Sequence, residues 1–334
     1  MGISQTARET RRETPMDPAI ILFGLGIGVL VGMTGMGGGS LMTPLLILVI
    51  GVQPTTAIGT DIFYSAITKT VGGWRHLKMK TVNMGMVFWL SVGSVPSAVA
   101  GVFFISYLQT QIGEEKLDSL LYAMLGGTLL MVGIITLARA LLLANLIDER
   151  DDFEMKHRHK VAAVVIGATT GFVIGITSAG SGTVIAILLI TVFRLSPRRV
   201  VGTDIFHAAV LLWAASFAHI IGGNVDFGLA ANIIIGSVPG VVIGSALSGK
   251  APIGFLRTAL GLVLVGSGFV TIQKGDPNVW PFAAAVAGIG LGLIIAAPHY
   301  LNRRRERNGG GKPPEGGLGP PHDRSEELTP EVVG

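Results

Sequence analysis

The chain contains the same unit twice, and both copies are apolar. Aligned without a gap, residues 24–101 match residues 167–244. The strongest shared block is Gly-Thr-Asp-Ile-Phe at 59–63 and 202–206, and a proline, a histidine and a Gly-Ser-Val-Pro block also recur in register. Shared apolar composition alone would not align these other residues. A duplicated apolar unit that is broken by glycines is typical of secondary transporters, which hold their substrate where the halves meet.

The composition indicates a membrane protein. Hydrophobic residues make up 49% of the chain and charged residues 14%, whereas a soluble domain carries about 25% charged residues. The charges gather in short clusters between apolar stretches, as in a chain that crosses a bilayer several times. The net charge of +4 comes without a stripe of aromatic and basic residues, so we expect no nucleic acid partner. The absence of cysteine excludes disulfides and thiolate metal sites.

Each copy begins with two apolar stretches that are too short to cross the membrane separately, since a spanning helix needs about 20 apolar residues. These pairs are 18–33 with 40–52, and 161–176 with 183–193. Glycine-rich segments separate them, at 35–40 and 178–183. Glycine runs form helix poorly, so we expect a broken or re-entrant helix in each copy, followed by about three transmembrane helices.

The charges of equivalent loops are opposite in the two copies. The loop near 52–55 is uncharged, whereas its equivalent in the second copy carries basic residues, and the next pair of loops shows the reverse pattern. The basic loop residues are Arg75, Lys78 and Lys80 in the first copy, and Arg194, Arg198 and Arg199 in the second. Because positive loops favour the cytoplasm, this pattern predicts two inverted repeats. The alternative topology lets the first segment cross fully.

The expected fold class is therefore all-α, a polytopic membrane protein of two inverted repeats with one extra C-terminal helix. The expected segments are a polar N-terminal tail at 1–17, transmembrane repeat 1 at 18–143, a cytoplasmic linker at 144–160, transmembrane repeat 2 at 161–272, an extra transmembrane helix at 273–302 and a disordered cytoplasmic tail at 303–334. The first tail lacks the apolar core and cleavage site of a signal peptide. The last has few apolar residues. A homo-oligomer is left open.

The glycine breaks are candidate anion sites. Residues 35–40 lack the Gly-Lys-Ser/Thr ending of a nucleotide-binding P-loop. Small residues spaced by four, such as Gly24 and Gly28, are explained by close helix packing. A glycine run at the start of a half-helix instead leaves backbone N–H groups free, and the helix dipole favours an anion there. The expected substrate-binding positions are Gly37, Gly38, Gly39, Ser40, Gly180, Ser181, Gly182 and Thr183.

Each Gly-Thr-Asp block lies about two turns inside a helix that is expected to start at a proline. Helix capping would explain Thr and Asp near a helix start. A carboxylate below the membrane interface is costly, however, and by default marks an ion or proton path. We expect Asp61 and Asp204 to couple protons, with a structural network as the alternative. We also expect Thr60 and Thr203 to complete the set of substrate ligands.

Three further polar side chains have two interpretations each. Lys69 follows Asp61 by eight residues, which places both near one helix face, and Leu212 stands at the equivalent position. Lys69 either supplies positive charge to an anion or extends along the helix to the interface. His76 and His219 align at the ends of the second spans. They are candidates for proton coupling, with an interfacial or capping role as the alternative.

No arrangement of nucleophile and base and no metal-ligand spacing stands out, so we expect no enzyme, no cofactor and no metal site.

The motifs resemble the sulfite exporter TauE/SafE family. The resemblance rests on Gly-Met-Gly-Gly-Gly-Ser-Leu-Met-Thr-Pro at 35–44, Pro-Thr-Thr-Ala-Ile-Gly-Thr-Asp at 54–61 and Gly-Thr-Asp at 202–204, and it covers residues 18–298. It implies a multi-pass inner-membrane carrier of sulfur-containing anions, such as sulfite, sulfoacetate or other organosulfonates.

Together these observations predict a secondary transporter that moves a small sulfur-containing anion across the inner membrane by alternating access, with coupling to protons. The expected partners are the small anionic substrate, protons and the lipid bilayer. An uncoupled anion channel that uses the same hydrogen-bond donors is one alternative. A membrane receptor or scaffold that binds without transporting is the other.

Overall fold

Helices make up nearly all of the part of the chain that the structure, a computed structural model, describes. These residues are 16–34, 39–142, 155, 157–180, 182–248, 253–275, 280–281, 283–284 and 288. The first copy forms α1 (Pro18–Thr34), α2 (Gly39–Leu45), the π-helix η1 (Leu46–Ile50), α3 (Pro54–Lys78), α4 (Met84–Ile112) and α5 (Glu114–Leu142). The second forms α6 (His157–Thr177), α7 (Thr183–Thr191), α8 (Pro197–Ile221), α9 (Phe227–Ser248) and α10 (Ile253–Lys274).

The all-α, multi-span class is thereby confirmed. Among the described residues, five helices are long and apolar enough to cross a membrane, and three further apolar helices are shorter. Four of the expected segments lie wholly or mostly outside the described residues. These are the two tails at 1–17 and 303–334, the linker at 144–160 and the extra helix at 273–302.

Local sequence sets the helix boundaries in the same way in both copies. α3 and α8 each start at a proline, Pro54 and Pro197, whose missing N–H needs no partner in the first turn. At the next helix start, the Asn83 side chain accepts a hydrogen bond from Met86 N at 3.0 Å. The equivalent bond in the second copy runs from Leu229 N to the Asp226 side chain at 2.9 Å. Such capping satisfies backbone N–H groups that the first turn leaves unpaired.

The second predicted interruption falls between helices, whereas residues 35–38 of the first lie outside the described residues. α1 ends at Thr34 and α2 begins at Gly39, while α6 ends at Thr177 and α7 begins at Thr183. The second break contains two residues in the left-handed region, Ser178 with φ 58° and Gly180 with φ 95°. Only glycine adopts such angles at little cost, so the serine conformation must be held by its surroundings.

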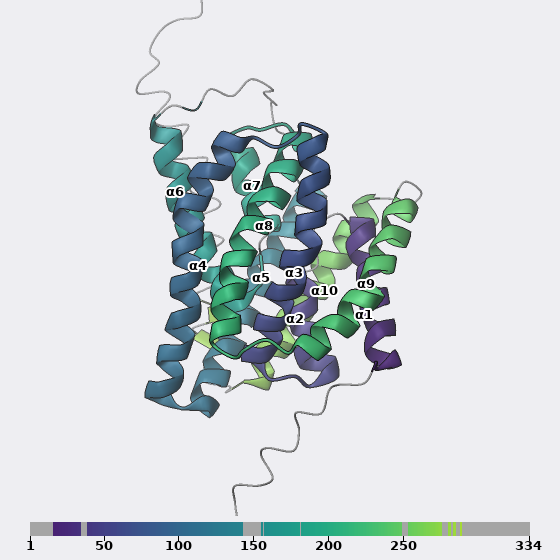
Figure 1. The fold of residues 1–334 in the computed structure, drawn as a ribbon, viewed down its shortest axis with the longest axis vertical. Coiled ribbons are helices and arrows are strands. Elements are labelled where there is room, and N and C mark those ends of the chain that lie inside the picture. Colours follow the sequence, from purple (N-terminus) through teal and green to yellow (C-terminus); the bar gives the residue numbers. More distant parts are fainter. Residues whose placement is uncertain are drawn as a thin grey trace, which may run out of the picture.

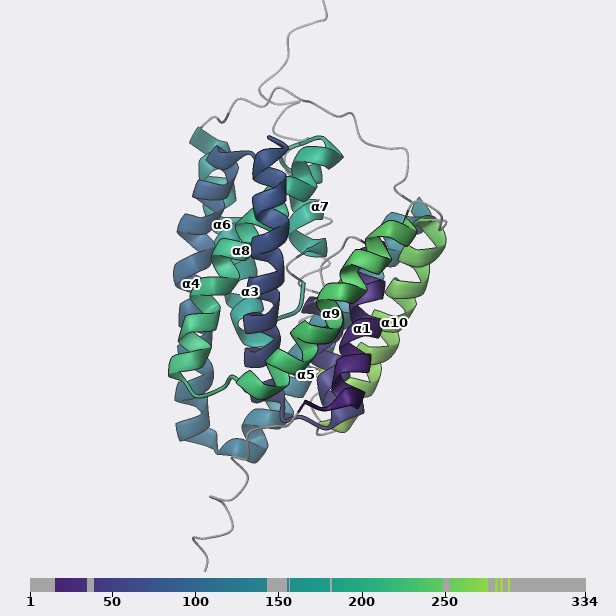
Figure 2. The same cartoon turned by 45° about the vertical axis from the view of Figure 1, so that its right-hand side comes forward.

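Helices of one copy pair with helices of the other (Figures 1 and 2). α3 packs on its own equivalent α8, and α5 on its equivalent α10. The other two large contacts, the crossed-over pairs, join helices that are not equivalent to each other. α1 of the first copy packs on α9 of the second, and their equivalents, α6 and α4, pack on each other in the same way. In Figure 2, α1, α9 and α10 form a leaning group beside the group of α3, α4, α6 and α8. The contacts of one half are thus repeated in the other.

α3 and α8 run antiparallel. The start of α3 lies near the turn after α8, where Thr60 Oγ1 accepts a hydrogen bond from Asp226 N at 3.0 Å. The start of α8 lies near the turn after α3, where Thr203 Oγ1 accepts from Asn83 N, also at 3.0 Å. Between these ends, Trp213 Nε1 donates to Thr70 Oγ1 at 2.8 Å. Equivalent helices that point in opposite directions are what inverted repeats require.

Glycines let the crossed-over helix pairs approach closely. A Cβ atom added to Gly28 of α1 would lie 2.3 Å from the Ser237 carbonyl oxygen of α9, and one added to Gly171 of α6 would lie 2.4 Å from the Ser94 carbonyl oxygen of α4. Real Cβ atoms essentially never come within 3.0 Å of another heavy atom. The packing role that the spacing of these glycines predicts is confirmed.

Among the described residues, the two ends of the helix bundle carry opposite charge. The end of α3 meets the starts of α6 and α8 at what we call the basic end, which carries Arg75, Lys78, Lys80, Arg158, Lys160, Arg194, Arg198 and Arg199. The turns between α4 and α5 and between α8 and α9 meet at the acidic end, which carries Asp17, Glu114, Glu115, Asp118 and Asp226 against Lys116 and Lys274. The charge pattern read from separate loops therefore becomes a difference between two ends of one bundle.

Candidate functional site

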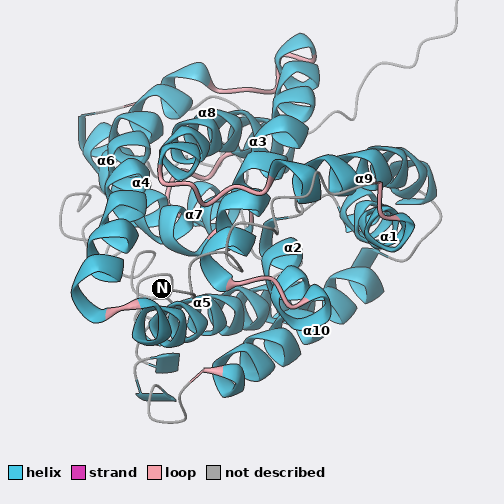
Figure 3. Ribbon diagram, turned by 60° about the horizontal axis from the view of Figure 1, so that its bottom comes forward, coloured by secondary structure: helices cyan, strands magenta, loops and turns pink. Residues whose placement is uncertain are grey.

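The start of α2 and the second break meet in the middle of the bundle. Gly180 N donates a hydrogen bond to Ser40 Oγ at 3.2 Å, although the residues lie 140 positions apart. α2 starts one residue before Ser40 and α7 starts three residues after Gly180. In Figure 3, α2 and α7 lie inside the ring of the longer helices. The N-terminal ends of two helices therefore face one another at the centre, where their dipoles add positive potential.

Asp61 joins α2 to the second break through its carboxylate. Thr43 Oγ1 of α2 donates to Asp61 Oδ2 at 2.5 Å, and Ser178 Oγ of the second break donates to the same oxygen at 2.7 Å. Ser65, one turn further along α3, donates to Asp61 Oδ1 at 3.1 Å. Asp61 is completely buried. Hydrogen bonds to a buried carboxylate are among the strong ones, so this contact holds α2, α3 and the second break together.

The same bond accounts for the backbone of Ser178. A left-handed residue other than glycine is an uncommon conformation that the surroundings must hold. Ser178 N donates to Ile174 O at 2.7 Å, while its hydroxyl is tied to Asp61. The segment that precedes α7 is therefore fixed at both its backbone and its side chain.

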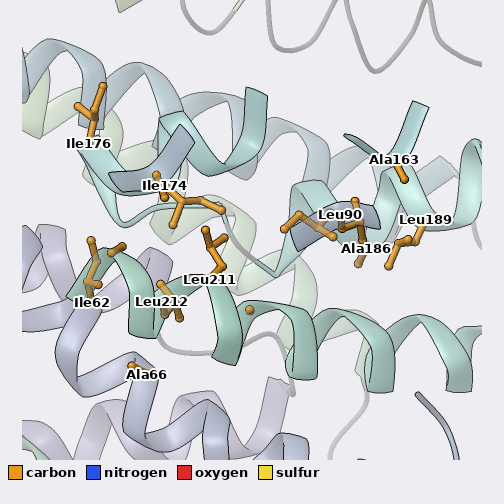
Figure 4. Close-up of a cluster of buried hydrophobic side chains, with 14 of the residues drawn as sticks. Ile62, Ala66, Leu90, Ala163, Ile174, Ile176, Ala186, Leu189, Leu211 and Leu212 are labelled. Carbon is orange, nitrogen blue, oxygen red and sulfur yellow. The ribbon is translucent and has the colours of Figure 1, made fainter. Parts of the chain in front are cut away.

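Lys69 is also buried, with 6% of its surface exposed. Its charge interacts with Asp204 of α8 and with Asp61 of its own helix. The equivalent position, Leu212, belongs to the largest apolar cluster, and Figure 4 shows it there with Ile62 of α3. The second copy thus has an apolar core residue where the first has a cation, and the site has one buried lysine and two buried aspartates.

Asp204 differs from Asp61 in its hydrogen bonds. It is 6% exposed, and its Oδ1 atom has no hydrogen-bond partner. His207, one turn further along α8, is completely buried and was not singled out from the sequence. Its Nε2 lies 2.8 Å from Ser94 Oγ of α4, and its Nδ1 has no partner.

Four other predicted residues contact turns or helix ends. Thr60 and Thr203 use their hydroxyl groups to accept from the turns described above. His76 Nδ1 lies 2.9 Å from Thr81 Oγ1, at the basic end. His219 Nε2 donates to Gly175 O at 3.0 Å, near the end of α6. In this conformation all four side chains hold helix ends in place.

The structure brings part of the predicted glycine site together. Gly39 is the first residue of α2, Gly182 directly precedes α7, and Thr183 is the first residue of α7 and is buried. Gly37, Gly38 and Ser181 lie outside the described residues. The Gly180 amide, an expected anion donor, has Ser40 as its partner here.

A cavity of about 250 Å³ opens at the acidic end. It is lined by the start of α3, the turn between α4 and α5 and the turn after α8, including Gln53, Thr55, Glu114, Asp118 and Asn224. Among the residues that the structure describes, no three His, Cys, Asp or Glu side chains gather as metal ligands would.

The π-helix η1 has a tie of its own to the second copy. Lys274, the last residue of α10, donates from Nζ to the Ile47 carbonyl at 2.9 Å. A π-helix leaves its carbonyl groups displaced from regular α-helical bonding and often lies near a functional site. The end of α10 therefore contacts the segment that directly follows the first break.

This geometry defines a multi-pass membrane protein with two facing broken helices and a buried polar centre. The sulfite exporter TauE/SafE family model matches residues 20–271. The chain is 39% identical over 251 residues to the probable membrane transporter protein YjnA of Bacillus subtilis (strain 168). The aligned region covers 74% of this chain and 98% of that protein. It is 27% identical over 253 residues to the probable membrane transporter protein YdhB of the same organism, covering 76% and 99%.

A third relative is a probable membrane transporter protein of Xylella fastidiosa (strain 9a5c), which is 26% identical over 260 residues, with 76% of this chain and 95% of that protein covered. No solved structure matches the chain. The chain belongs to the sulfite exporter TauE/SafE family, and it is a multi-pass membrane protein of that transporter type.

Proposed function

We propose that the protein is a secondary transporter that carries a small sulfur-containing anion across the inner membrane by alternating access, coupled to protons. One observation carries this proposal. The N-terminal ends of α2 and α7 face each other at Ser40 and Gly180, in the middle of the bundle and between two equivalent halves. Paired half-helix N-termini at a repeat interface suit an anion that must be released on either side.

The chemistry of the centre favours an oxyanion. Gly39, Gly182 and Thr183 stand at the starts of the two half-helices and offer backbone N–H groups and a hydroxyl. Gly180 N donates to Ser40 Oγ at 3.2 Å. A bound anion would replace Ser40 as the acceptor of this N–H and would itself accept from the Ser40 hydroxyl, so both bonds would have a charged acceptor. Gly37, Gly38 and Ser181 belong to the same proposal from the sequence.

Lys69 supplies the one buried positive side chain at the described centre. A cation at this depth compensates a substrate anion that has left its hydration shell. The sulfur-containing class comes from the family description, which names sulfite export. Sulfite and the sulfonates share a pyramidal group of three oxygens on sulfur, and such a group accepts hydrogen bonds from several directions at once.

The proposed orientation follows from the ends of the bundle. The basic end faces the cytoplasm and the acidic end faces outward, because loops rich in Lys and Arg stay inside. Because α3 and α8 run antiparallel between these ends, a rocking motion that closes one end opens the other. Protons are proposed to bind among the buried aspartates, Asp61 and Asp204, whose charge is costly in a membrane.

The test uses purified protein in liposomes with labelled sulfite and labelled sulfoacetate. We expect saturable uptake and counterflow, in which unlabelled anion inside accelerates entry of label. Lys69→Met should weaken binding by about 10- to 100-fold, which is the loss expected for one charged hydrogen-bonding partner. Leu212→Met, at the equivalent position of the other copy, is the matched control and should leave KM unchanged.

The alternatives predict different results. An uncoupled channel would pass current without counterflow, and a receptor or scaffold would bind either anion without moving it. Liposomes that carry the protein but take up neither anion faster than protein-free liposomes would refute the proposal.

A further inference from the structure

Two aspartates that are equivalent in the duplicated sequence have unequal surroundings. Asp61 accepts hydrogen bonds from Thr43, Ser65 and Ser178. Asp204 is buried as well, yet its Oδ1 atom has no hydrogen-bond partner. An unsatisfied buried polar atom costs about 1–3 kcal/mol, and more if it is charged. The difference therefore needs a physical reason.

The reason lies at two aligned positions. Ala186 stands in the second copy where Thr43 stands in the first, and Ala208 stands where Ser65 stands. Alanine has no donor. The second copy therefore lacks the two hydroxyl groups that the first copy supplies to its own aspartate, although the Gly-Thr-Asp block itself is identical.

The second copy has a histidine beside its aspartate instead. His207 follows Asp204 by three residues, so both side chains lie on the same face of α8. His207 Nε2 lies 2.8 Å from the Ser94 hydroxyl of α4, while its Nδ1 has no partner. Two neighbouring side chains thus each keep one unsatisfied atom in the protein interior. Each of these two atoms can bind a proton, and protonation would give each group an N–H or O–H donor in place of an unsatisfied acceptor.

The charges that act on this pair come from α3. Lys69 interacts with Asp204 and His207, and Asp61 interacts with Lys69. From α4, the group that contacts His207 is the uncharged hydroxyl of Ser94. When Asp204 is ionised, Lys69 is its counter-charge. When Asp204 holds a proton, one of the two negative charges that act on Lys69 is removed, and a substrate anion can take its place.

We propose that the two aspartates have different roles: Asp204 and His207 form the site that takes up and releases the transported proton, whereas Asp61 is a positioning residue that fastens the two broken helices. This inference rests on the proposed proton-coupled anion transport. It links the proton to the anion through Lys69, because protonation of Asp204 removes one of the two negative charges that act on this cation and deprotonation restores it. Anion and proton then cross together.

The experiment separates exchange from coupling. Sulfite itself takes up a proton near neutral pH, so its flux follows a pH gradient even without coupling by the protein. Sulfoacetate keeps its charge and is the better probe. Counterflow of labelled sulfoacetate needs binding and alternating access but no net proton movement. Uptake driven by a one-unit pH difference needs coupling, which for one proton per anion adds about tenfold accumulation.

We expect Asp204→Asn and His207→Gln to retain counterflow and to lose the tenfold accumulation that the pH difference produces. Asp61→Asn should lower counterflow and pH-driven uptake by the same factor. Thr43→Val, which removes one donor to Asp61 without changing volume, should behave like Asp61→Asn, while Thr43→Ser should restore both activities because it keeps the hydroxyl group.

Two results would overturn the inference. One is full pH-driven accumulation in both Asp204→Asn and His207→Gln. The other is loss of accumulation with normal counterflow in Asp61→Asn. Because His207→Gln leaves both aspartates intact, it tests the pair even if an aspartate variant fails to fold. A wild-type protein without sulfoacetate or sulfite counterflow would instead contradict the proposed function, which is a separate outcome.

Discussion

Two glycines on the same helix should respond in opposite ways to the same substitution. Gly28 and Gly26 both lie in α1. A Cβ atom on Gly28 would lie 2.3 Å from the Ser237 carbonyl oxygen and 2.7 Å from Ser237 Cα, whereas a Cβ atom on Gly26 would meet nothing within 4 Å. We predict that Gly28→Ala destabilises the protein and that Gly26→Ala does not.

The magnitude follows from the contact. Ordinary van der Waals contact begins near 3.4 Å, so α1 and α9 must separate by about 1 Å to admit the new methyl group, and overpacking of this kind costs about 1–3 kcal/mol. The obstacle at Gly28 is backbone, which has no rotamer to change, so we expect the upper end. A loss of about 3 kcal/mol corresponds to roughly a 100-fold change in the ratio of folded to unfolded protein. Gly26→Ala instead gains helix propensity, worth up to about 1 kcal/mol.

Thermal unfolding in detergent measures this difference. Gly28→Ala should lower the midpoint by on the order of 5–10 °C, and Gly26→Ala should leave it unchanged or raise it. Serine at position 28 should behave like alanine, since its Cβ is the same. Equal midpoints for the two alanine variants would refute the close approach of α1 and α9.

Two further predictions concern the ends of the bundle. Lys274→Met removes the donor to the Ile47 carbonyl, and because Lys274 is exposed we expect a loss of about 1 kcal/mol or less, measured by the same unfolding assay. The chain has no cysteine, so single cysteines need no background removal. In the variants Lys80→Cys and Arg199→Cys, the cysteine should react with an impermeant maleimide added on the cytoplasmic side. In Glu115→Cys, the cysteine should react only with reagent added on the outer side. Labelling of positions 80 and 199 from opposite sides would contradict the shared basic end.

The sequence alone predicted the parts of the fold that depend on local chemistry. Glycine runs are poor helix whatever surrounds them, so the interruption before Thr183 followed from composition. The prolines at 54 and 197 marked helix starts for a similar reason. The spacing of Gly24 and Gly28 indicated close packing, although it did not identify α9 as the partner helix.

The site was predicted less completely, because its contacts join distant parts of the chain. Asp61 and Asp204 were singled out, but the donors to Asp61 come from Thr43, 18 residues away, and Ser178, 117 residues away. No periodic pattern connects such positions. A comparison of the two copies at each aligned position would have suggested the asymmetry, since Thr43 aligns with Ala186.

His207 was missed because its equivalent is Tyr64 and its neighbours are apolar. The signal was present, since an ionisable residue inside a transmembrane segment is a functional candidate by default. Its burial and its contact with Ser94 became apparent only when α4 and α8 were placed together.

The crossed-over helix pairs have a consequence for biosynthesis. α1 belongs to the first half, yet its close-packed partner is α9, and the chain from 35 to 226 must be made before that partner appears. At 5–20 residues per second, α1 waits in the bilayer for roughly 10–40 s with its glycine face uncovered. Neither half closes by itself, so a translating ribosome that stalls after α5 leaves an open surface that lipids, an insertion factor or quality-control proteases will meet first.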